Sequence, residues 1–137
     1  MALRHFLFAL QISAFVTTAC LPSRTAGADL LGSDRDPALK SAVVNSEPGA
    51  GYGPEHRPFK GIPGIARAPD GRLWVTWYAG GTDEGPENYV ALVSSGDDGR
   101  TWSEINTVID PPGEVRAYDP VVWIDPMGEL WWFYAQS

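Results

Sequence analysis

The run Ser95–Trp102 reads SGDDGRTW and has the pattern S-x-D-x-G-x-T-W, which constrains the fold more than any other part of the chain. It lies between two apolar runs, Asn88–Ser94 and Ile105–Ile109, and this placement predicts the turn of a β-hairpin. An aspartate such as Asp97 accepts hydrogen bonds from turn amides. Gly99 can adopt a positive φ without steric cost. The run therefore predicts antiparallel β-structure on both sides of residue 99.

The other fixed positions of the pattern also have local structural roles. The hydroxyls of Ser95 and Thr101 can bond the backbone of the turn. Trp102 carries a large ring, and we expect that ring to fold back over the hairpin and to bury much of its surface.

An internal repeat supports a series of similar hairpins. Gly71 recurs as Gly128, 57 residues later, and three more positions recur at the same offset: Pro63, Leu73 and Trp74 match Pro120, Leu130 and Trp131. A repeat of about fifty residues that contains about four strands has the size of one β-propeller blade. Ile62–Ile109 would form a complete blade, and Val121–Ala135 would form the first half of the next.

Alternating and apolar runs predict strands along the chain, separated by turn signals such as Pro69-Asp70-Gly71. The expected strands are Ser41–Asn45, Arg72–Ala79, Tyr89–Ser94, Ile105–Ile109, Val121–Ile124 and Leu130–Ala135, with a short apolar run at Ile62–Arg67. Glu47–Lys60 is rich in Pro and Gly and is predicted to be a loop.

Composition narrows the class of protein and its partners. The chain has 137 residues, 12% of them aromatic, with 15 Gly and 12 Pro, which favours a turn-rich all-β domain. The net charge of −7 argues against nucleic acid and anionic membrane surfaces as partners. Gly96–Gly99 is too short for a calcium loop, and His5 and His56 lack the spacing of metal ligands. We therefore expect no metal and no cofactor.

The N-terminus has the features of a secretory signal peptide, which we place at residues 1–28. Arg4 precedes a mostly apolar segment, Phe6–Ala19, that is too short to span a bilayer comfortably. Ala26-Gly27-Ala28 offers a cleavage site. Lipoprotein processing at Cys20 is the less favoured alternative. These features predict a secreted, periplasmic or cell-envelope protein with no membrane span in the mature chain, in which residues 29–58 form a linker with an N-terminal strand and loop.

The pattern at Ser95–Trp102 resembles the Asp box (BNR repeat) of the sialidase (neuraminidase)-type β-propellers, and the resemblance covers residues 59–137. It implies an all-β, sialidase-like propeller segment of about one and a half four-stranded blades of a six-bladed propeller. It also implies an exported exo-alpha-sialidase-like glycoside hydrolase that acts on a glycan. We expect the chain to be the truncated N-terminal piece of a longer protein and to be inactive by itself; a small domain that oligomerises to supply the missing blades is the alternative.

The same resemblance suggests a general acid/base. In the family an aspartate in the form D-x-x-x-x-N lies twelve residues before the Asp-box serine. Asp83 fits this position relative to Ser95, and Asn88 fits the pattern. A carboxylic acid there would protonate the leaving glycosidic oxygen and then activate water. Glu84 and Glu87 lie close enough in sequence to be confused with it.

The resemblance breaks down at the carboxylate-binding arginine. Sialidases begin the first blade with Phe/Tyr-Arg-Ile-Pro, whereas Lys60-Gly61-Ile62-Pro63 stands here, so Gly61 replaces one of three arginines that clamp the sialic acid carboxylate. Lys60, Arg67 and Arg116 are the candidates to supply the missing charge. Whether the protein accepts sialic acid is left open.

Tyr118-Asp119-Pro120 stands where sialidases have Ser-Asp-Pro. Asp119 either binds a sugar hydroxyl or caps a turn before Pro120. The family's tyrosine nucleophile, its glutamate partner and two further arginines come from later blades and match nothing in this chain. A noncatalytic glycan- or protein-binding propeller is therefore the alternative function.

Overall fold

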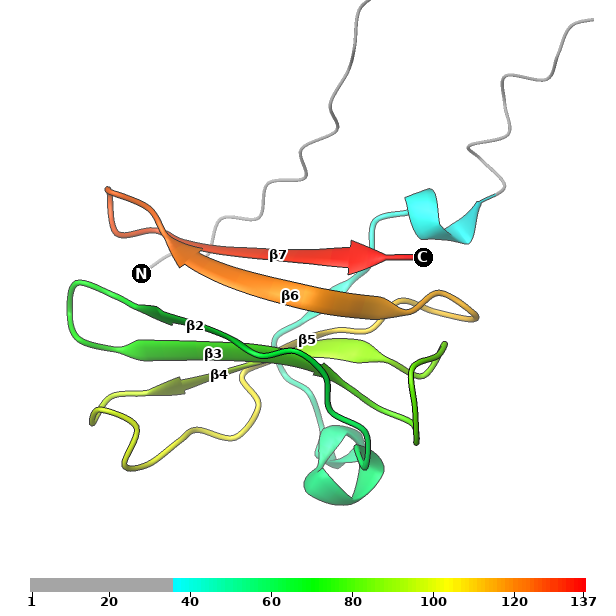
Figure 1. Ribbon diagram of the computed structural model, residues 1–137, viewed down its shortest axis with the longest axis horizontal. Helices are drawn as coiled ribbons and strands as arrows, with labels where there is room; N and C mark the ends of the chain where they lie inside the picture. Colours follow the sequence, from blue (N-terminus) through cyan, green and yellow to red (C-terminus); the bar gives the residue numbers. More distant parts are fainter. Residues whose placement is uncertain (1–35) are drawn as a thin grey trace, which may run out of the picture.

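The computed structural model describes residues 36–137, which form two antiparallel β-sheets (Figure 1). The expected signal peptide at 1–28 and the alternative at Cys20 lie outside the described residues. The strands are β1 (Val44–Asn45), β2 (Gly64–Arg67), β3 (Leu73–Ala79), β4 (Tyr89–Ser95), β5 (Thr107–Ile109), β6 (Ala117–Ile124) and β7 (Leu130–Gln136). The 3₁₀ helices are η2 (Pro37–Leu39), η3 (Ala50–Tyr52) and η4 (Pro54–His56). The all-β class predicted from the sequence is confirmed.

The first sheet is an antiparallel meander with one added strand. Its order is β1-β5-β4-β3-β2, so β2 to β5 are neighbours in chain order and β1 pairs with the outer edge of β5. Strand β4 is buried along its whole length. Both of its faces are covered: Leu92 packs toward the second sheet, and Ala91 packs with the partly buried Tyr52 and Ile105 on the other side.

The second sheet is the hairpin β6–β7, which lies over the first (Figure 1). Val122 and Leu130 form a buried apolar cluster with Leu92. Beside this cluster the indole Nε1 of Trp132 donates a 2.8 Å hydrogen bond to Oγ1 of the fully buried Thr76. The two sheets are thus joined by apolar packing and by a specific polar contact.

The internal repeat read from the sequence appears as the same turn in both hairpins. Gly71 N–H donates to the carbonyl of Ala68 at 2.9 Å, and Gly128 N–H donates to the carbonyl of Asp125 at 2.9 Å. The two glycines have φ of +87° and +85°, a region that L side chains rarely adopt. The matching glycines are therefore required by the turn itself.

The turn at Ser95–Trp102, which we call the Asp-box turn after its sequence pattern, has the hydrogen bonds expected from that pattern. Oδ1 of Asp97 accepts from the backbone N–H of Thr101 and from the hydroxyl of Ser95, both at 2.8 Å, and Oδ2 accepts from the Thr101 hydroxyl at 2.6 Å. The Ser95 hydroxyl also accepts from Gly99 N–H at 2.9 Å. The prediction for Trp102 is wrong in extent, because its residue is 44% exposed. Its ring lies beside Gly99 at the tip of the turn.

Several boundaries differ from the sequence prediction. The predicted loop Glu47–Lys60 contains η3 and η4, whose single turns are closed by bonds such as Gly53 N–H to Ala50 O and leave no periodic pattern. Strand β5 begins only at Thr107, and β6 begins already at Ala117. Within residues 36–137 no helix is long and apolar enough to cross a membrane.

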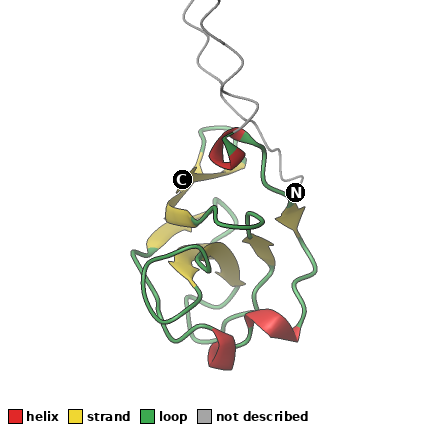
Figure 2. Cartoon of the chain, turned by 90° about the vertical axis from the view of Figure 1, so that its right-hand side faces the viewer, coloured by secondary structure: helices red, strands yellow, loops and turns green. Residues whose placement is uncertain are grey.

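The sheets have two distinct ends. The turns 68–72, 96–106 and 125–129 gather at the left of Figure 1, and we call this the turn end. The loop 80–88 after β3 and the segment 110–116 before β6 lie at the right, and we call this the loop end. Figure 2 looks onto the loop end, with η2 near the C-terminus at the top and the other two 3₁₀ helices at the bottom.

Candidate functional site

Side chains from three separate segments meet at the loop end around Glu84. The hydroxyl of Tyr78 donates to Glu84 Oε1 at 2.8 Å, and Arg116 Nη1 donates to Glu84 Oε2 at 3.1 Å. The Arg116 guanidinium also lies over the ring of Tyr118, 4.1 Å from its centroid. We call Tyr78, Glu84, Arg116 and Tyr118 the Glu84 cluster.

Tyr78 is the fixed member of this cluster. It is the penultimate residue of β3, is 4% exposed, and packs in a buried apolar group with Val90, Ile109 and Ala117. Its ring also lies against Gly61, and a Cβ built at position 61 would overlap the ring atoms Cζ and Cε1. The ring therefore occupies the space that a side chain at position 61 would need.

Hydrogen bonding sets the charge states of the cluster. The hydrogen bond from Tyr78, and next the one from Arg116, lower the pKa of Glu84. The hydrogen bond to Glu84, burial and the nearby charge of Asp119 raise the pKa of Tyr78. The hydrogen bond to Glu84 raises the pKa of Arg116. At neutral pH Glu84 is thus a carboxylate, Tyr78 a neutral phenol and Arg116 a charged guanidinium.

Asp83, the predicted acid/base, lies next to this cluster but is not part of it. Its carboxylate is exposed, and Oδ1 accepts the backbone N–H of Glu84 at 2.8 Å. The loop that carries Asp83 is held from below by Asn88, which is fully buried. Asn88 Nδ2 donates to the carbonyls of Gly80 and Asp83 at 2.9 and 3.0 Å, and Oδ1 accepts from Gly85 N–H at 2.9 Å. The asparagine of the D-x-x-x-x-N pattern therefore has a structural role.

Asp119 occupies a β-bulge inside β6. The pairing of β6 with β7 shifts between Tyr118 and Val121, and Asp119 has a φ of +46°. The suggestion that Asp119 caps a turn before Pro120 is wrong, because both residues lie within the strand. The bulge leaves Asp119 exposed at the loop end, where its charge reaches Tyr78.

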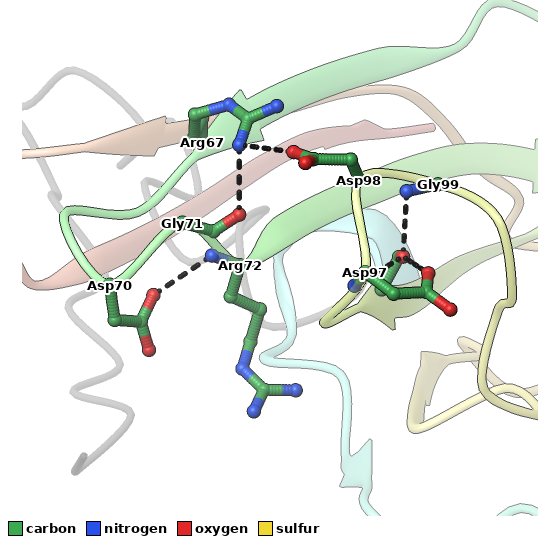
Figure 3. A network of polar contacts seen from close by, with 8 residues as sticks. Arg67, Asp70, Gly71, Arg72, Asp97, Asp98 and Gly99 are labelled. Carbon is green, nitrogen blue, oxygen red and sulfur yellow. Dashed lines mark hydrogen bonds and ion pairs between the residues drawn. The ribbon is translucent and has the colours of Figure 1, made fainter.

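The three candidate cations have different positions. Arg67 lies at the turn end, where it pairs with Asp98 at 2.7 Å and donates to the carbonyl of Gly71 at 3.1 Å (Figure 3). Lys60 Nζ donates to the carbonyl of Arg57 at 2.8 Å. Of the three, Arg116 is the one that joins the Glu84 cluster, whereas Arg67 lies at the opposite end of the sheets.

A groove of about 750 Å³ runs beside the loop end, between η3, η4 and the loop 80–87. On its wall Tyr52 donates its hydroxyl to Asp110 Oδ2 at 2.8 Å, and the rings of Tyr52 and Tyr89 meet edge to face at 4.8 Å. Burial, and then the bond to Asp110, raise the pKa of Tyr52 to about 12. No group of His, Cys, Asp and Glu within residues 36–137 is arranged to hold a metal ion.

Two residues of the site were missed from the sequence. Tyr78 lies in the predicted strand Arg72–Ala79 and was given no role of its own, and Glu84 was considered only as a neighbour of Asp83. The signal for Tyr78 is its position one residue before the end of β3, which places it beside the loop. The contact between Glu84 and Arg116 spans 32 residues and has no local signal.

Comparison with known proteins adds no family assignment. No family model matches the chain, and a search of curated proteins finds no match. The likeness to sialidase-type propellers is therefore a resemblance of sequence motifs alone.

Proposed function

We propose that the chain is part of an exported, sialidase-like β-propeller glycoside hydrolase that cleaves terminal sugars from glycans. One observation carries this proposal. The exposed carboxylates of Asp83 and Asp119 and the partly exposed Arg116 gather at the loop end, opposite the Asp-box turn of Asp97. Convergent polar groups on loops above a rigid sheet are typical of functional sites.

The propeller part of the proposal is supported by how the repeat is packed. Val121, Trp123 and Phe133 on the outer face of β6–β7 are 48–54% exposed. The positions 57 residues earlier are Gly64, Ala66 and Thr76, which lie against β6–β7. Since the equivalent face in the first sheet is covered by the next hairpin, stacking of a further blade would cover this one.

We assign the acid/base role to Asp83 rather than to Glu84. Its carboxylate is exposed on a loop that Asn88 holds in place. Glu84 is kept ionised by Tyr78 and Arg116, so it is a poor proton donor. In this scheme the Asp83 carboxyl protonates the departing glycosidic oxygen, and the resulting carboxylate later takes a proton from the attacking water. Asp119 accepts hydrogen bonds from sugar hydroxyls.

Noncatalytic glycan binding is the second candidate. It is favoured by the Glu84 cluster, because the Glu84 carboxylate accepts hydrogen bonds from Tyr78 and Arg116 and stays ionised. Such a carboxylate positions Arg116 but supplies no proton.

The test uses the complete propeller of which we propose this chain is a part, expressed with its own N-terminus and purified from the medium or the cell envelope. Hydrolysis of a panel of fluorogenic glycosides and binding to a glycan array are measured for the wild type and for Asp83→Asn. Asp70→Asn, the same change at an exposed position of the turn end, is the matched control.

We expect Asp83→Asn to reduce hydrolysis by about 10²-fold or more, with glycan binding retained and with Asp70→Asn unaffected. Unchanged hydrolysis by Asp83→Asn would overturn the assigned acid role. Binding without hydrolysis in the wild type would establish the second candidate. A protein that neither binds nor cleaves any glycan would overturn both.

A further inference from the structure

We infer that the loop end takes neutral sugars and discriminates against sugars that carry a carboxylate, and that Glu84 is the residue that sets this preference. The inference rests on the proposed function, because it concerns the ligand of the same site. Its basis is the arrangement of Glu84, Arg116 and Tyr78 together with the missing side chain at Gly61.

The guanidinium nearest the site is already occupied by an internal anion. Arg116 Nη1 bonds Glu84 Oε2 at 3.1 Å, and the other oxygen of the same carboxylate accepts the Tyr78 hydroxyl at 2.8 Å. The Arg116 and Glu84 side chains are 24% and 52% exposed, so the pair lies at the surface that a ligand would approach. A carboxylate on a sugar would have to displace Glu84 from Arg116 before it could bind there.

The position of a second arginine is closed by the fold. Gly61 offers no side chain, and the Tyr78 ring fills the space into which one would project. Where the resemblance to sialidases would place a guanidinium, this chain has the phenol of Tyr78, whose hydroxyl already donates a hydrogen bond to Glu84. A buried phenol cannot supply the positive charge that binds an anion.

The remaining charges near the cluster are mostly negative. Asp83 lies in the same loop as Glu84, and the charge of Asp119 is close enough to raise the pKa of Tyr78. The ammonium of Lys60, a nearby cation, donates a hydrogen bond to the carbonyl of Arg57. An anionic sugar would therefore meet more like charge than opposite charge, whereas the hydroxyls of a neutral sugar would find carboxylate acceptors in Asp83 and Asp119.

The experiment compares sugars that differ only in a carboxylate. Binding of the same complete protein is measured by calorimetry or ligand-observed NMR for two matched pairs: glucose and glucuronate, and galactose and galacturonate. The variants are Glu84→Gln, which removes the internal anion but keeps the side-chain size, and Glu87→Gln, which removes one charge from the same loop without touching Arg116. Circular dichroism checks that each variant is folded.

We expect the wild type and Glu87→Gln to bind the neutral member of a pair at least ten-fold more tightly than the acidic one. Glu84→Gln should raise affinity for the acidic member about ten-fold or more, and adding Arg116→Gln should abolish that gain. Preferential binding of the acidic sugar by the wild type would overturn the inference and leave glycan binding intact. An equal effect of Glu84→Gln and Glu87→Gln would show general charge repulsion and would remove Glu84 as the determinant. Binding of no sugar at all would remove the proposed function, and this inference with it.

Discussion

Gly61 and Tyr78 are joined twice: the amide of Gly61 donates to the carbonyl of Tyr78 at 2.8 Å, and the Tyr78 ring covers the α-carbon of Gly61. The backbone contact continues the β2–β3 pairing toward the loop end, where Lys60 also bridges to Ala79. The Tyr78 ring fills the space that a side chain at position 61 would need. A larger residue at position 61 therefore requires a smaller one at position 78. The glycine that breaks the likeness to sialidases is thus explained by the tyrosine opposite it.

Gly61→Ala should destabilise the protein by about 1–3 kcal/mol, because the new methyl group must displace a ring held in the core. Tyr78→Leu removes the ring atoms Cζ and Cε1 that a Cβ at position 61 would overlap. In that background Gly61→Ala should cost much less, which gives a coupling free energy between the two sites. Denaturant unfolding of the two single variants and the double variant measures it. Additive free energies of unfolding would contradict the direct contact.

Asn88→Ala should cost about 2 kcal/mol of unfolding free energy, because it leaves buried backbone groups of the loop 80–88 without partners. The amides of that loop should also exchange with solvent faster. Asn106→Ala, which removes an amide near the turn end, is the control and should leave exchange in the loop unchanged. A loop whose exchange is insensitive to Asn88→Ala would show that other contacts hold it.

The acid stability of the Asp-box turn depends on Asp97. Hydrogen bonds from Thr101 and then from Ser95 lower its pKa from 3.8 to about 2. A carboxylate whose pKa is lower in the folded state stabilises the fold above its unfolded pKa, and this contribution disappears as the pH falls through the folded pKa. The wild type should therefore lose stability between about pH 4 and pH 2.

Asp97→Asn should flatten this part of the curve of unfolding free energy against pH. Thr101→Val, which removes the strongest of the hydrogen bonds, should also weaken the pH dependence. Asp98→Asn removes the adjacent charge without affecting these bonds and serves as the control. Identical slopes for the wild type and Asp97→Asn would contradict the role of the turn.

How much the sequence predicts follows the range of the interactions. The Asp-box bonds join Asp97 to residues at most four positions away, so their residue types reveal the turn. The repeat was visible for the same reason, since Gly71 and Gly128 each close a local turn. The Glu84–Arg116 pair joins distant segments, and the contact of Gly61 with the Tyr78 ring depends on strand register. Neither contact can be predicted from the sequence until the pairing of the strands is known.

Tyr52 provides a test at high pH in the groove beside the loop end. Burial and the bond to Asp110 raise its pKa from 10.0 to about 12. Because the pKa of Tyr52 is higher in the folded state, the contribution of this group to the free energy of unfolding is complete below pH 10. That contribution disappears as the pH rises through about 12. The difference in tyrosinate absorbance between the wild type and Tyr52→Phe isolates this group. Asp110→Asn should shift its titration toward lower pH, and an unshifted titration would show that burial alone is responsible.

The contact between Trp132 and Thr76 tests the packing of the two sheets. Trp132→Phe keeps most of the ring but removes the donor to Thr76 Oγ1, which still donates to the carbonyl of Ala91 at 2.8 Å. We expect a loss of about 1 kcal/mol in unfolding free energy, the usual net value of one such bond. With Thr76→Val already present, Trp132→Phe no longer breaks a bond and should cost less, as measured by urea unfolding of the four proteins of the cycle. Equal costs in both backgrounds would contradict a stabilising hydrogen bond between Trp132 and Thr76.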